Sequence, residues 1–380
     1  MNFMKIGIDA RLWNETGVGR YIRNLVWQLQ DLDKKNSYVL FVSKRFKIED
    51  LGFKNDKWKI IYTDIHWHTV EEQILFPKIL KQENLDLVHF PYFSVPILYN
   101  RPYVLTIHDL IINHYPTGKA TTLPAPVYYL KHLGYQYVIK QAAQRSRKII
   151  AVSQATKDEI VQHLSVPEDK VIVTYEGVDQ KDSSKFKVQS AKSQFKIQNY
   201  FLYVGNAYPH KNLERLVDAF ALIAKEYPDV KLVLVGKEDY FYRNLQKKVV
   251  SLKIEKQIQL TGFVDEAALT DYYKNALATV LPSLMEGFGL TGLEAMQSGC
   301  LVLASDIPSL KEIYQDAAVY FDPLAVDSIH ATIRKVLEKR RTYDSYLEKG
   351  KKRLSFFSWK RMAEETLKIY EGSFSIRSDQ

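Results

Sequence analysis

The sequence predicts an α/β protein made of two doubly wound domains in series, each with a parallel sheet covered by helices. Three observations support this: the length, the alternation of short apolar runs with helical patterns, and a polar stretch near the middle. With 380 residues, the chain exceeds the size of one ordinary hydrophobic core. Its composition, 46% hydrophobic and 26% charged, is that of a globular protein.

The first half contains short, β-branched apolar runs separated by amphipathic segments. Such alternation favours parallel strands connected by helices. The first run is followed by the loop RLWNETGVG and then by a helical pattern that starts with Tyr21. The strands expected in this half are residues 5–9, 38–42, 85–90, 103–109, 148–153 and 171–177.

A polar stretch rich in Lys, Ser and Gln then interrupts the pattern, which starts again after it. We therefore expect a first domain at 1–178, a linker at 179–198 and a second domain at 199–357, with an amphipathic segment, 358–380, packing back on the first domain. Ligands of such sheets bind beyond the carboxyl ends of the strands, so two facing domains would form a cleft. The second set of expected strands is 200–205, 230–236, 257–262, 276–282, 300–305 and 318–322.

The net charge of +9 leaves three interpretations open: a solvated surface, contact with an anionic membrane, or nucleic-acid binding. No nucleic-acid-binding motif accompanies the charge, so we predict no nucleic-acid partner. The single cysteine, Cys300, excludes an intrachain disulfide. Without a signal-peptide pattern or a run of about 18–20 apolar residues, we expect a cytoplasmic protein, with peripheral contact on the inner face of the membrane left open.

The most informative segment is PSLMEGFGLTGLEAMQSG (282–299), which combines a strand end, a glycine-containing loop and a helix expected to start near Leu290. Its carboxylates Glu286 and Glu294 can accept hydrogen bonds from sugar or ribose hydroxyls. Free N–H groups near Leu290 and Thr291 can hold a phosphate. The alternative is a purely structural one, in which the helix dipole favours an acidic residue in the first turn. For Glu294 alone, this explanation would be sufficient.

Two further loops also follow strands. In VGNAYPHKNLERL (204–216), Lys211 can neutralise a leaving diphosphate, although a solvated loop lysine is the alternative. The loop ETGVGRYI (15–22) contains half of a dinucleotide fingerprint and supplies Arg20 as a cation, although a tight strand-to-helix turn explains it equally well.

Histidines form the last group of candidates. His108, in TIHD, is placed to face a cleft as a polar, uncharged group, and Asp109 either caps the next segment or orients it. Simple packing at a strand end is the alternative. His66 and His68 would share one face of a strand, but no Cys, His or Asp cluster accompanies them, so we predict no metal site.

Together these motifs resemble glycosyltransferase family 4, the retaining family with the two-domain GT-B fold. The resemblance covers almost the whole chain. Within the family, the sequence is most similar to the bacterial branch that includes mannosyl- and rhamnosyltransferases of cell-surface polysaccharides. It rests on GVGRYI, TIHD, SQATKDEI, VGNAYPHKNLERLVDAF, LVLVGKED, TGFVDEAALTDYYKNA, PSLMEGFGLTGLEAMQSG and SDIPSLKEI.

The resemblance implies that Glu286 contacts the donor sugar, Lys211 stabilises the leaving phosphate and His108 sits near the reacting carbon. It implies that Glu294 binds the ribose. Further donor contacts would be Gly17 and Gly19 near the phosphates, Lys237 and Val264 at the nucleobase, the amides of Gly287, Phe288 and Gly289 at the sugar, and those of Leu290 and Thr291 at the diphosphate.

Two residues depart from the family pattern. Asn206 stands where many members have an arginine, which places more phosphate charge on Lys211 or Arg20. Thr291 replaces a proline at the helix start.

The expected activity is transfer of a mannosyl-like hexose from a nucleotide diphosphate sugar, GDP favoured over UDP, to a hydroxyl of a glycan or lipid-linked glycan, without a cofactor. The alternatives are a non-catalytic nucleotide-sugar or nucleic-acid binding protein, a phosphorylase with pyridoxal phosphate, or a sugar-nucleotide epimerase.

Overall fold

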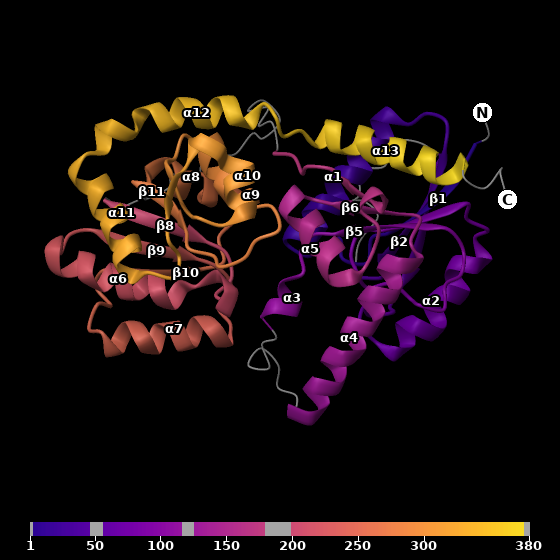
Figure 1. The fold of residues 1–380 in the computed structure, drawn as a ribbon, viewed down its shortest axis with the longest axis horizontal. Helices are drawn as coiled ribbons and strands as arrows, with labels where there is room; N and C mark the ends of the chain where they lie inside the picture. The colour runs from indigo at the N-terminus through magenta and orange to yellow at the C-terminus, as the bar shows by residue number, and fades with distance from the viewer. Residues whose placement is uncertain (1–2, 46–55, 116–124, 179–198, 376–380) are drawn as a thin grey trace. The chain divides into compact units, whose positions relative to one another are not determined.

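A computed structural model describes residues 3–45, 56–115, 125–178 and 199–375 of the chain (Figure 1). These residues form two compact units. Unit 1 contains residues 1–113, 123–177 and 358–380, and unit 2 contains residues 114–122 and 178–357. The linker expected at 179–198 lies outside the described residues.

Unit 1 is built on a seven-stranded parallel sheet with the order β3-β2-β1-β4-β5-β6-β7. The central strands β4 and β5 are completely buried, and β1 is buried except at Lys5, because helices cover both faces of a parallel sheet. The strands are β1 (Lys5–Asp9), β2 (Ser37–Ser43), β3 (Trp58–Thr63), β4 (Leu87–Phe90), β5 (Tyr103–Ile107), β6 (Lys148–Ala151) and β7 (Val171–Val173).

The helices of unit 1 bury apolar stripes at helical spacing. In α1 (Gly17–Leu32) the buried stripe includes Tyr21, Leu25 and Leu29, four residues apart. The last helix, α13 (Trp359–Ser375), packs against α1, so the end of the chain belongs to unit 1. The other helices are α2 (Val70–Gln82), α3 (Ile111–His114), α4 (Ala125–Arg145) and α5 (Gln154–Leu164).

A buried polar network fixes α13 to the sheet. His89 on β4 contacts the hydroxyl of Tyr370 through Nδ1 (2.6 Å) and that of Thr106 through Nε2 (2.7 Å). All three side chains are fully buried. Buried polar groups need such partners, because an unpaired one would lose its hydrogen bonds to water. The network therefore fixes the position of α13 more specifically than apolar contacts alone.

Unit 2 repeats the architecture with a six-stranded parallel sheet of order β10-β9-β8-β11-β12-β13. The strands are β8 (Tyr200–Val204), β9 (Lys231–Val235), β10 (Ile258–Gly262), β11 (Ala278–Leu281), β12 (Val302–Ser305) and β13 (Val319–Phe321). The helices are α6 (Leu213–Glu226), α7 (Tyr240–Ser251), α8 (Glu266–Asn275), α9 (Leu290–Gln297), α10 (Pro308–Tyr314), α11 (Val326–Glu338) and α12 (Asp344–Leu354).

Each apolar run expected to be a strand contains one, and the strands are parallel as predicted. The sequence interpretation missed β3, an edge strand whose apolar and lysine residues are mixed and only partly buried. The expectation that His66 and His68 share a strand face is wrong, because β3 ends at Thr63 and His68 has a positive φ of 59°.

Strand order locates the ligand edge of each sheet. The order reverses between β1 and β4 in unit 1 and between β8 and β11 in unit 2. At such a reversal the connecting helices leave toward opposite faces, and a crevice opens at the carboxyl ends of the two strands. None of the helices in the described part of the chain is sufficiently long and apolar to cross a membrane.

Candidate active site

An ion pair between Lys211 and Glu286 lies at the strand reversal of unit 2. Lys211 follows β8 and Glu286 follows β11, and these strands are neighbours in the sheet. Lys211 Nζ is 2.7 Å from Glu286 Oε1, and the side chains are 18% and 13% exposed. The hydroxyl of Ser283 donates to the same oxygen at 2.6 Å. The two residues named from the sequence as catalytic in this domain are therefore in direct contact.

Hydrogen bonds to backbone carbonyls also connect the two loops that carry this pair. Pro209–Lys211 forms a 3-10 turn, after which Asn212 adopts a left-handed conformation (φ 61°). Its side-chain amide donates to the Pro282 carbonyl at 2.9 Å, and the Leu284 amide donates to the His210 carbonyl at 2.7 Å. The position of Lys211 is therefore set by the loop that carries Glu286.

The environment keeps Glu286 ionised. Burial on its own would raise the pKa of this carboxyl, but the charge and hydrogen bond of Lys211 and the hydrogen bond from Ser283 lower the pKa below its usual range. Both bonds are made to Oε1. Among the described residues, Oε2 has no hydrogen-bond partner, so it can accept a bond from a ligand hydroxyl.

The neighbouring His210 is neutral. Burial, with the positive charge of Lys211, lowers its pKa to about 4. The cation that faces Glu286 at neutral pH is therefore Lys211.

Helix α9 begins at Leu290, where the sequence predicted a helix start. The preceding Gly289 has φ 91°, and a Cβ there would lie 2.5 Å from the Tyr314 hydroxyl. That hydroxyl donates to the Gly289 carbonyl. No side chain caps the helix start, since glycine has none. The first N–H groups of α9 therefore suit an anion, as expected for Leu290 and Thr291.

Three other residues of unit 2 that are expected to bind the donor also lie in loops that directly follow strands. Asn206 follows β8, Lys237 follows β9 and Val264 follows β10, and these three strands are adjacent. Asn206 and Lys237 are exposed. Asn206 Oδ1 accepts a bond from the Tyr208 amide (3.3 Å), so the residue that replaces the family's arginine shapes the loop. Because the strands are parallel, all of these loops lie at the same end of the sheet, beyond the carboxyl ends of the strands.

The other predicted site residues of the 282–299 segment contact different parts of unit 2. Glu294 lies in the second turn of α9, where its Oε2 accepts a bond from the Tyr273 hydroxyl at 3.1 Å. Phe288 is buried and packs edge-on against Phe357. Gly287 is buried in the loop between Glu286 and Phe288.

In unit 1, His108 follows β5 and is held at both ring nitrogens. Nδ1 lies 3.0 Å from Glu176 Oε1, and Nε2 lies 3.0 Å from the Pro91 carbonyl oxygen. A carbonyl can only accept, so Nε2 carries a proton. The contacts with Glu176 and Pro91 together fix the orientation of the His108 ring.

Oδ1 of Asp109 accepts a bond from the Ile111 amide at 3.0 Å, at the start of α3, which agrees with the capping role that the sequence allowed. Sequence reasoning missed Glu176. The feature that could have identified Glu176 is its position after the last strand predicted for the first domain. Strand β7 pairs with β6, and β6 pairs with β5, the strand that His108 follows.

The expectation of a glycine loop after β1 needs correction. Gly17 begins α1, and Gly19 and Arg20 lie inside its first turns. A Cβ on Gly19 would lie 2.5 Å from the Trp13 carbonyl oxygen, so the protein itself fills this space. Gly17 has nothing within 4 Å of its Cβ position, and it is the glycine that can let a ligand approach.

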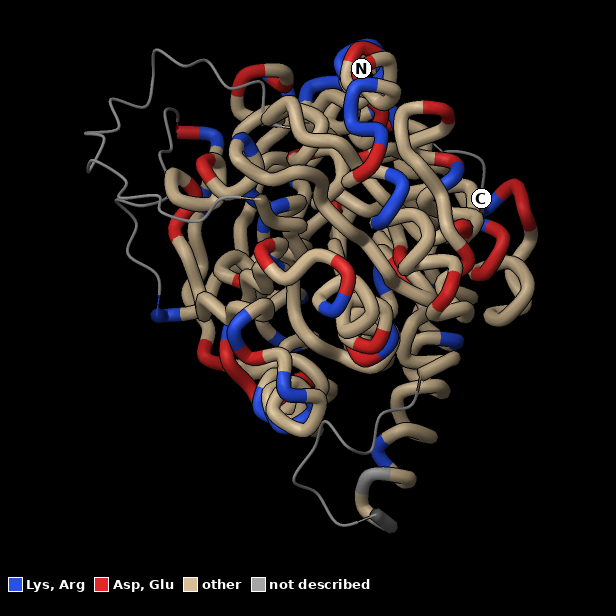
Figure 2. Tube along the Cα trace, turned by 90° about the vertical axis from the view of Figure 1, so that its left-hand side faces the viewer, with Lys and Arg blue, Asp and Glu red and all other residues tan. Residues whose placement is uncertain are grey.

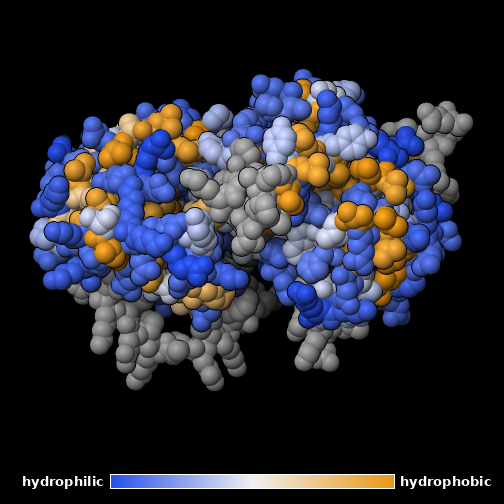
Figure 3. Space-filling model, turned by 90° about the horizontal axis from the view of Figure 1, so that it is seen from below, coloured by the Kyte–Doolittle hydropathy of each residue, from blue (hydrophilic) through white to orange (hydrophobic). Residues whose placement is uncertain are grey.

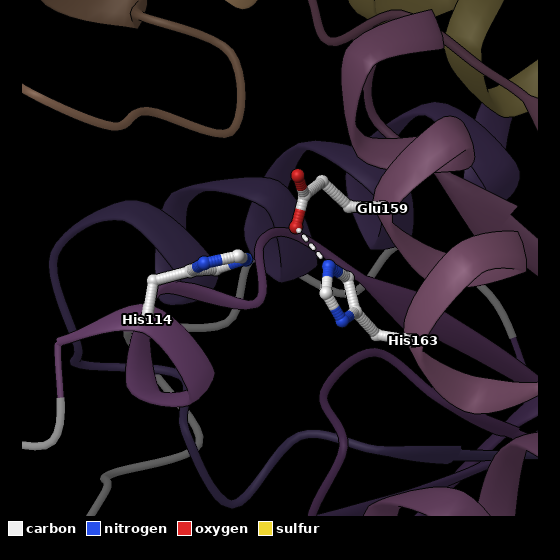
Figure 4. Close-up of side chains that lie close together, drawn as sticks. All are labelled: His114, Glu159 and His163. Carbon is white, nitrogen blue, oxygen red and sulfur yellow. Dashed lines mark ion pairs between the residues drawn. The ribbon is translucent and has the colours of Figure 1, made fainter.

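Helix α5 carries a contact between a histidine and a glutamate. His163 Nε2 is 3.4 Å from Glu159 Oε2, one helical turn earlier (Figure 4). His114, also labelled in Figure 4, is at the end of α3 and is grouped with unit 2.

Two family models match the chain, one for each half. Residues 16–182 match "Glycosyltransferase Family 4", and residues 185–353 match "Glycosyl transferases group 1". The chain is 27% identical to the O-antigen chain mannosyltransferase RfbU of Salmonella typhimurium, covering 71% of this chain and 70% of RfbU. It is 29% identical to the O-antigen chain mannosyltransferase B of Escherichia coli, covering 75% and 74%.

Solved structures share the fold over nearly the whole chain. Sucrose-phosphate synthase from Thermosynechococcus elongatus has a TM-score of 0.78 at 19% identity, covering 98% of this chain and all of that one. WaaG, a glycosyltransferase involved in lipopolysaccharide biosynthesis, has a TM-score of 0.74 at 14% identity, covering 96% and 99%. With two Rossmann-like domains of the GT-B type, and with both family models matched in sequence, the chain belongs to the family 4 and group 1 glycosyltransferases.

Proposed function

We propose that this enzyme is a retaining hexosyltransferase that moves a mannosyl-like sugar from a nucleotide diphosphate sugar to a glycan hydroxyl. GDP is favoured over UDP as the carrier, and the acceptor is a free or lipid-linked glycan of cell-surface polysaccharide synthesis. The relatives named as O-antigen mannosyltransferases support the sugar and the pathway class. The observation that carries the proposal is the Lys211–Glu286 pair in the loops after β8 and β11.

In this proposal Lys211 and α9 act on charge that grows as the donor bond breaks. Negative charge develops on the leaving diphosphate, and an ammonium group and free helix N–H groups stabilise it most when they are already in place. Oε2 of Glu286 accepts a sugar hydroxyl and orients the ring. Glu294 binds the ribose, and Lys237 and Val264 border the base.

The proposed step is a front-face displacement. The acceptor oxygen bonds to the anomeric carbon on the face from which the diphosphate departs, and the acceptor proton passes to a leaving phosphate oxygen. Configuration is retained without a covalent enzyme intermediate. His108 contacts the sugar near the reacting carbon, while Gly17 and Arg20 lie toward the phosphates. Mass-spectrometric detection of a glycosyl adduct on Glu286 would contradict this mechanism.

The first experiment is nucleotide release from a panel of UDP-, GDP-, ADP- and dTDP-sugars. We expect the wild-type protein to hydrolyse one GDP-sugar slowly, and Glu286→Ala and Lys211→Ala to lose that hydrolysis. The partly exposed Lys248→Ala serves as a matched control, because Lys248 pairs with Asp218 and not with Glu286. If calorimetry detects binding of none of these donors to the wild type, the proposal is wrong.

A second part of the proposal concerns the membrane. Five apolar or aromatic side chains of α4 are 44–72% exposed: Val127, Tyr129, Leu130, Leu133 and Tyr137. Figure 3 looks onto this side and shows hydrophobic side chains gathered over unit 1. We propose that α4 contacts a membrane surface peripherally, in the cytoplasm, when the acceptor is lipid-linked.

The distribution of charge sets the strength of this contact. Basic and acidic residues are interspersed over much of the chain (Figure 2), whereas α4 contains Lys131, Lys140 and Arg145 and no Asp or Glu, so positive charge adds to its attraction for an anionic surface. Cosedimentation with vesicles containing anionic lipid should fall for Leu130→Ser with Tyr129→Ser and stay unchanged for Tyr240→Ser, whose side chain is 50% exposed in unit 2. Equal cosedimentation of all variants would contradict the contact.

A further inference from the structure

Unit 1 contains a cavity at the carboxyl ends of β1, β2 and β3. Its volume is about 280 Å³, and it is lined by Arg11, Ser43, Arg45, Asp64, His66 and Trp67, with Ile65. We propose that it binds one neutral sugar ring of the acceptor glycan. This inference rests on the proposed function, since it assigns the acceptor subsite of the same enzyme. The location agrees with the ligand edge of a parallel sheet.

A buried arginine forms the inner wall. The Arg11 side chain is 2% exposed and lies 3.9 Å from the ring centroid of Phe76. Its Nε donates to Asp9 (2.9 Å), Nη2 donates to Asp9 (2.7 Å) and Glu72 (2.5 Å), and Nη1 donates to the Ile65 carbonyl (3.2 Å). A guanidinium has five N–H donors. One Nη1 hydrogen therefore has no acceptor among the described residues.

That unused donor favours a ligand with an acceptor oxygen. Leaving a buried donor unpaired is unfavourable, so a ligand oxygen on Arg11 would recover a lost hydrogen bond. The Glu72 carboxylate also accepts the Ser94 hydroxyl at 2.7 Å and the His68 amide at 2.9 Å. These bonds fix the guanidinium before a ligand arrives, which lowers the ordering cost of binding.

The charge balance favours a neutral ligand over a phosphate. Lys44 contributes through its ion pair with Asp64, 3.1 Å away. The fixed charges in and behind the cavity are equal in number, with Arg11, Arg45 and Lys44 against Asp9, Glu72 and Asp64. An anion would gain little from such a set, whereas vicinal hydroxyls can donate to Asp64 and accept from an arginine.

Aromatic rings complete the site. The rings of His66 and Trp67 lie with centroids 5.3 Å apart, and Trp67 is partly buried. A pyranose has a face of C–H groups that packs on an indole and a rim of hydroxyls that bonds to polar groups. The volume is at the lower end for ligand pockets, which fits a single ring and excludes a long oligosaccharide.

The test uses the full chain and methyl α-mannopyranoside as the neutral probe, with binding measured by saturation-transfer NMR. Binding should weaken at least tenfold in Trp67→Ala and in Arg45→Ala, and inorganic phosphate should not compete. Trp27→Ala is the matched control, because Trp27 is 40% exposed on α1 and does not line the cavity. Equal binding by wild type and both cavity variants, or displacement by phosphate, would overturn the proposal.

Two measurements separate this inference from the proposed function. Glu286→Gln should keep the glycoside signal, which shows that the probe is not in the donor site; loss of the signal there would contradict the cavity assignment. Calorimetry of wild type with GDP-mannose tests the donor site alone. In the transfer assay, Trp67→Ala should raise the acceptor KM about tenfold and leave the Kd of the nucleotide sugar unchanged.

Discussion

Both units place a basic side chain and a carboxylate in contact at the carboxyl ends of their strands, but the two pairs differ in kind. In unit 2, Lys211 and Glu286 carry permanent charges, and Oε2 of Glu286 is open among the described residues. In unit 1, Nδ1 of His108 lies 3.0 Å from Oε1 of Glu176, so the carboxylate positions an aromatic ring. His108 is also bound through Nε2 to the Pro91 carbonyl.

This difference separates two tasks. A permanent ion pair at neutral pH suits the stabilisation of a leaving diphosphate, which is negatively charged throughout that range. A histidine with both nitrogens occupied is a rigid group that presents its ring. Unit 2 thus depends on fixed electrostatics, and unit 1 on the position of a ring. Four experiments test this contrast.

The largest effect is expected for Lys211→Ala. Loss of a preorganised cation at the leaving group should lower kcat about 10²–10³-fold. Lys211→Arg should recover part of the rate, because it restores the charge with a different shape. Steady-state kinetics with the hydrolysed donor provides the measurement. A kcat within about threefold of wild type in Lys211→Ala would show that this pair has no role in the chemical step.

Gly19→Ala should lower the free energy of unfolding by about 1–3 kcal/mol, because its Cβ would meet backbone oxygens of Trp13 and Leu12 at 2.5 and 2.7 Å. Gly17→Ala should not destabilise, since nothing lies within 4 Å there and alanine favours helices. Urea unfolding followed by circular dichroism distinguishes the two. Equal stability would mean that α1 shifts to accommodate the added Cβ.

Glu176→Gln is expected to lower kcat about tenfold, the effect of a positioning residue. Glutamine keeps the size of the side chain but replaces the carboxylate that contacts Nδ1 of His108. Steady-state kinetics with the hydrolysed donor measures the effect. A kcat equal to that of wild type would show that the catalytic position of the His108 ring does not depend on Glu176.

The most gradual effect is a loss of stability in mild acid from buried neutral histidines in both units. Burial lowers the pKa of His89 to about 3 and that of His210 to about 4, whereas an unfolded histidine has a pKa of about 6.5. The unfolded state therefore binds more protons, and stability falls as pH drops from about 6.5 toward those values, by up to about 1.4 kcal/mol per pH unit for each.

Urea unfolding at pH 7, 6 and 5 measures this slope. His89→Gln, which can still bond to Tyr370 and Thr106, should reduce it by about one proton. The same reduction from His210→Gln would show that unit 2 shares the dependence. A slope that neither variant alters would assign the acid sensitivity to other groups.

The order of strands and helices could be predicted from the sequence because both periodicities are local. Runs such as KIGID and KLVLV are short and mainly apolar, and they became β1 and β9. The edge strand β3 escaped prediction because a half-exposed strand mixes lysine with apolar residues. The helix start at Gly17 was also missed, because glycines at a helix start resemble a turn.

Contacts between distant residues were decided by the tertiary structure. Lys211 and Glu286 were each predictable as loop residues, but their 2.7 Å contact depends on β8 lying beside β11. Likewise, Glu176 carries no motif, and it meets His108 only because β5, β6 and β7 are consecutive in the sheet. Residue type and spacing therefore determined which groups can do chemistry, whereas strand order, set by nonlocal packing, decided which of them touch.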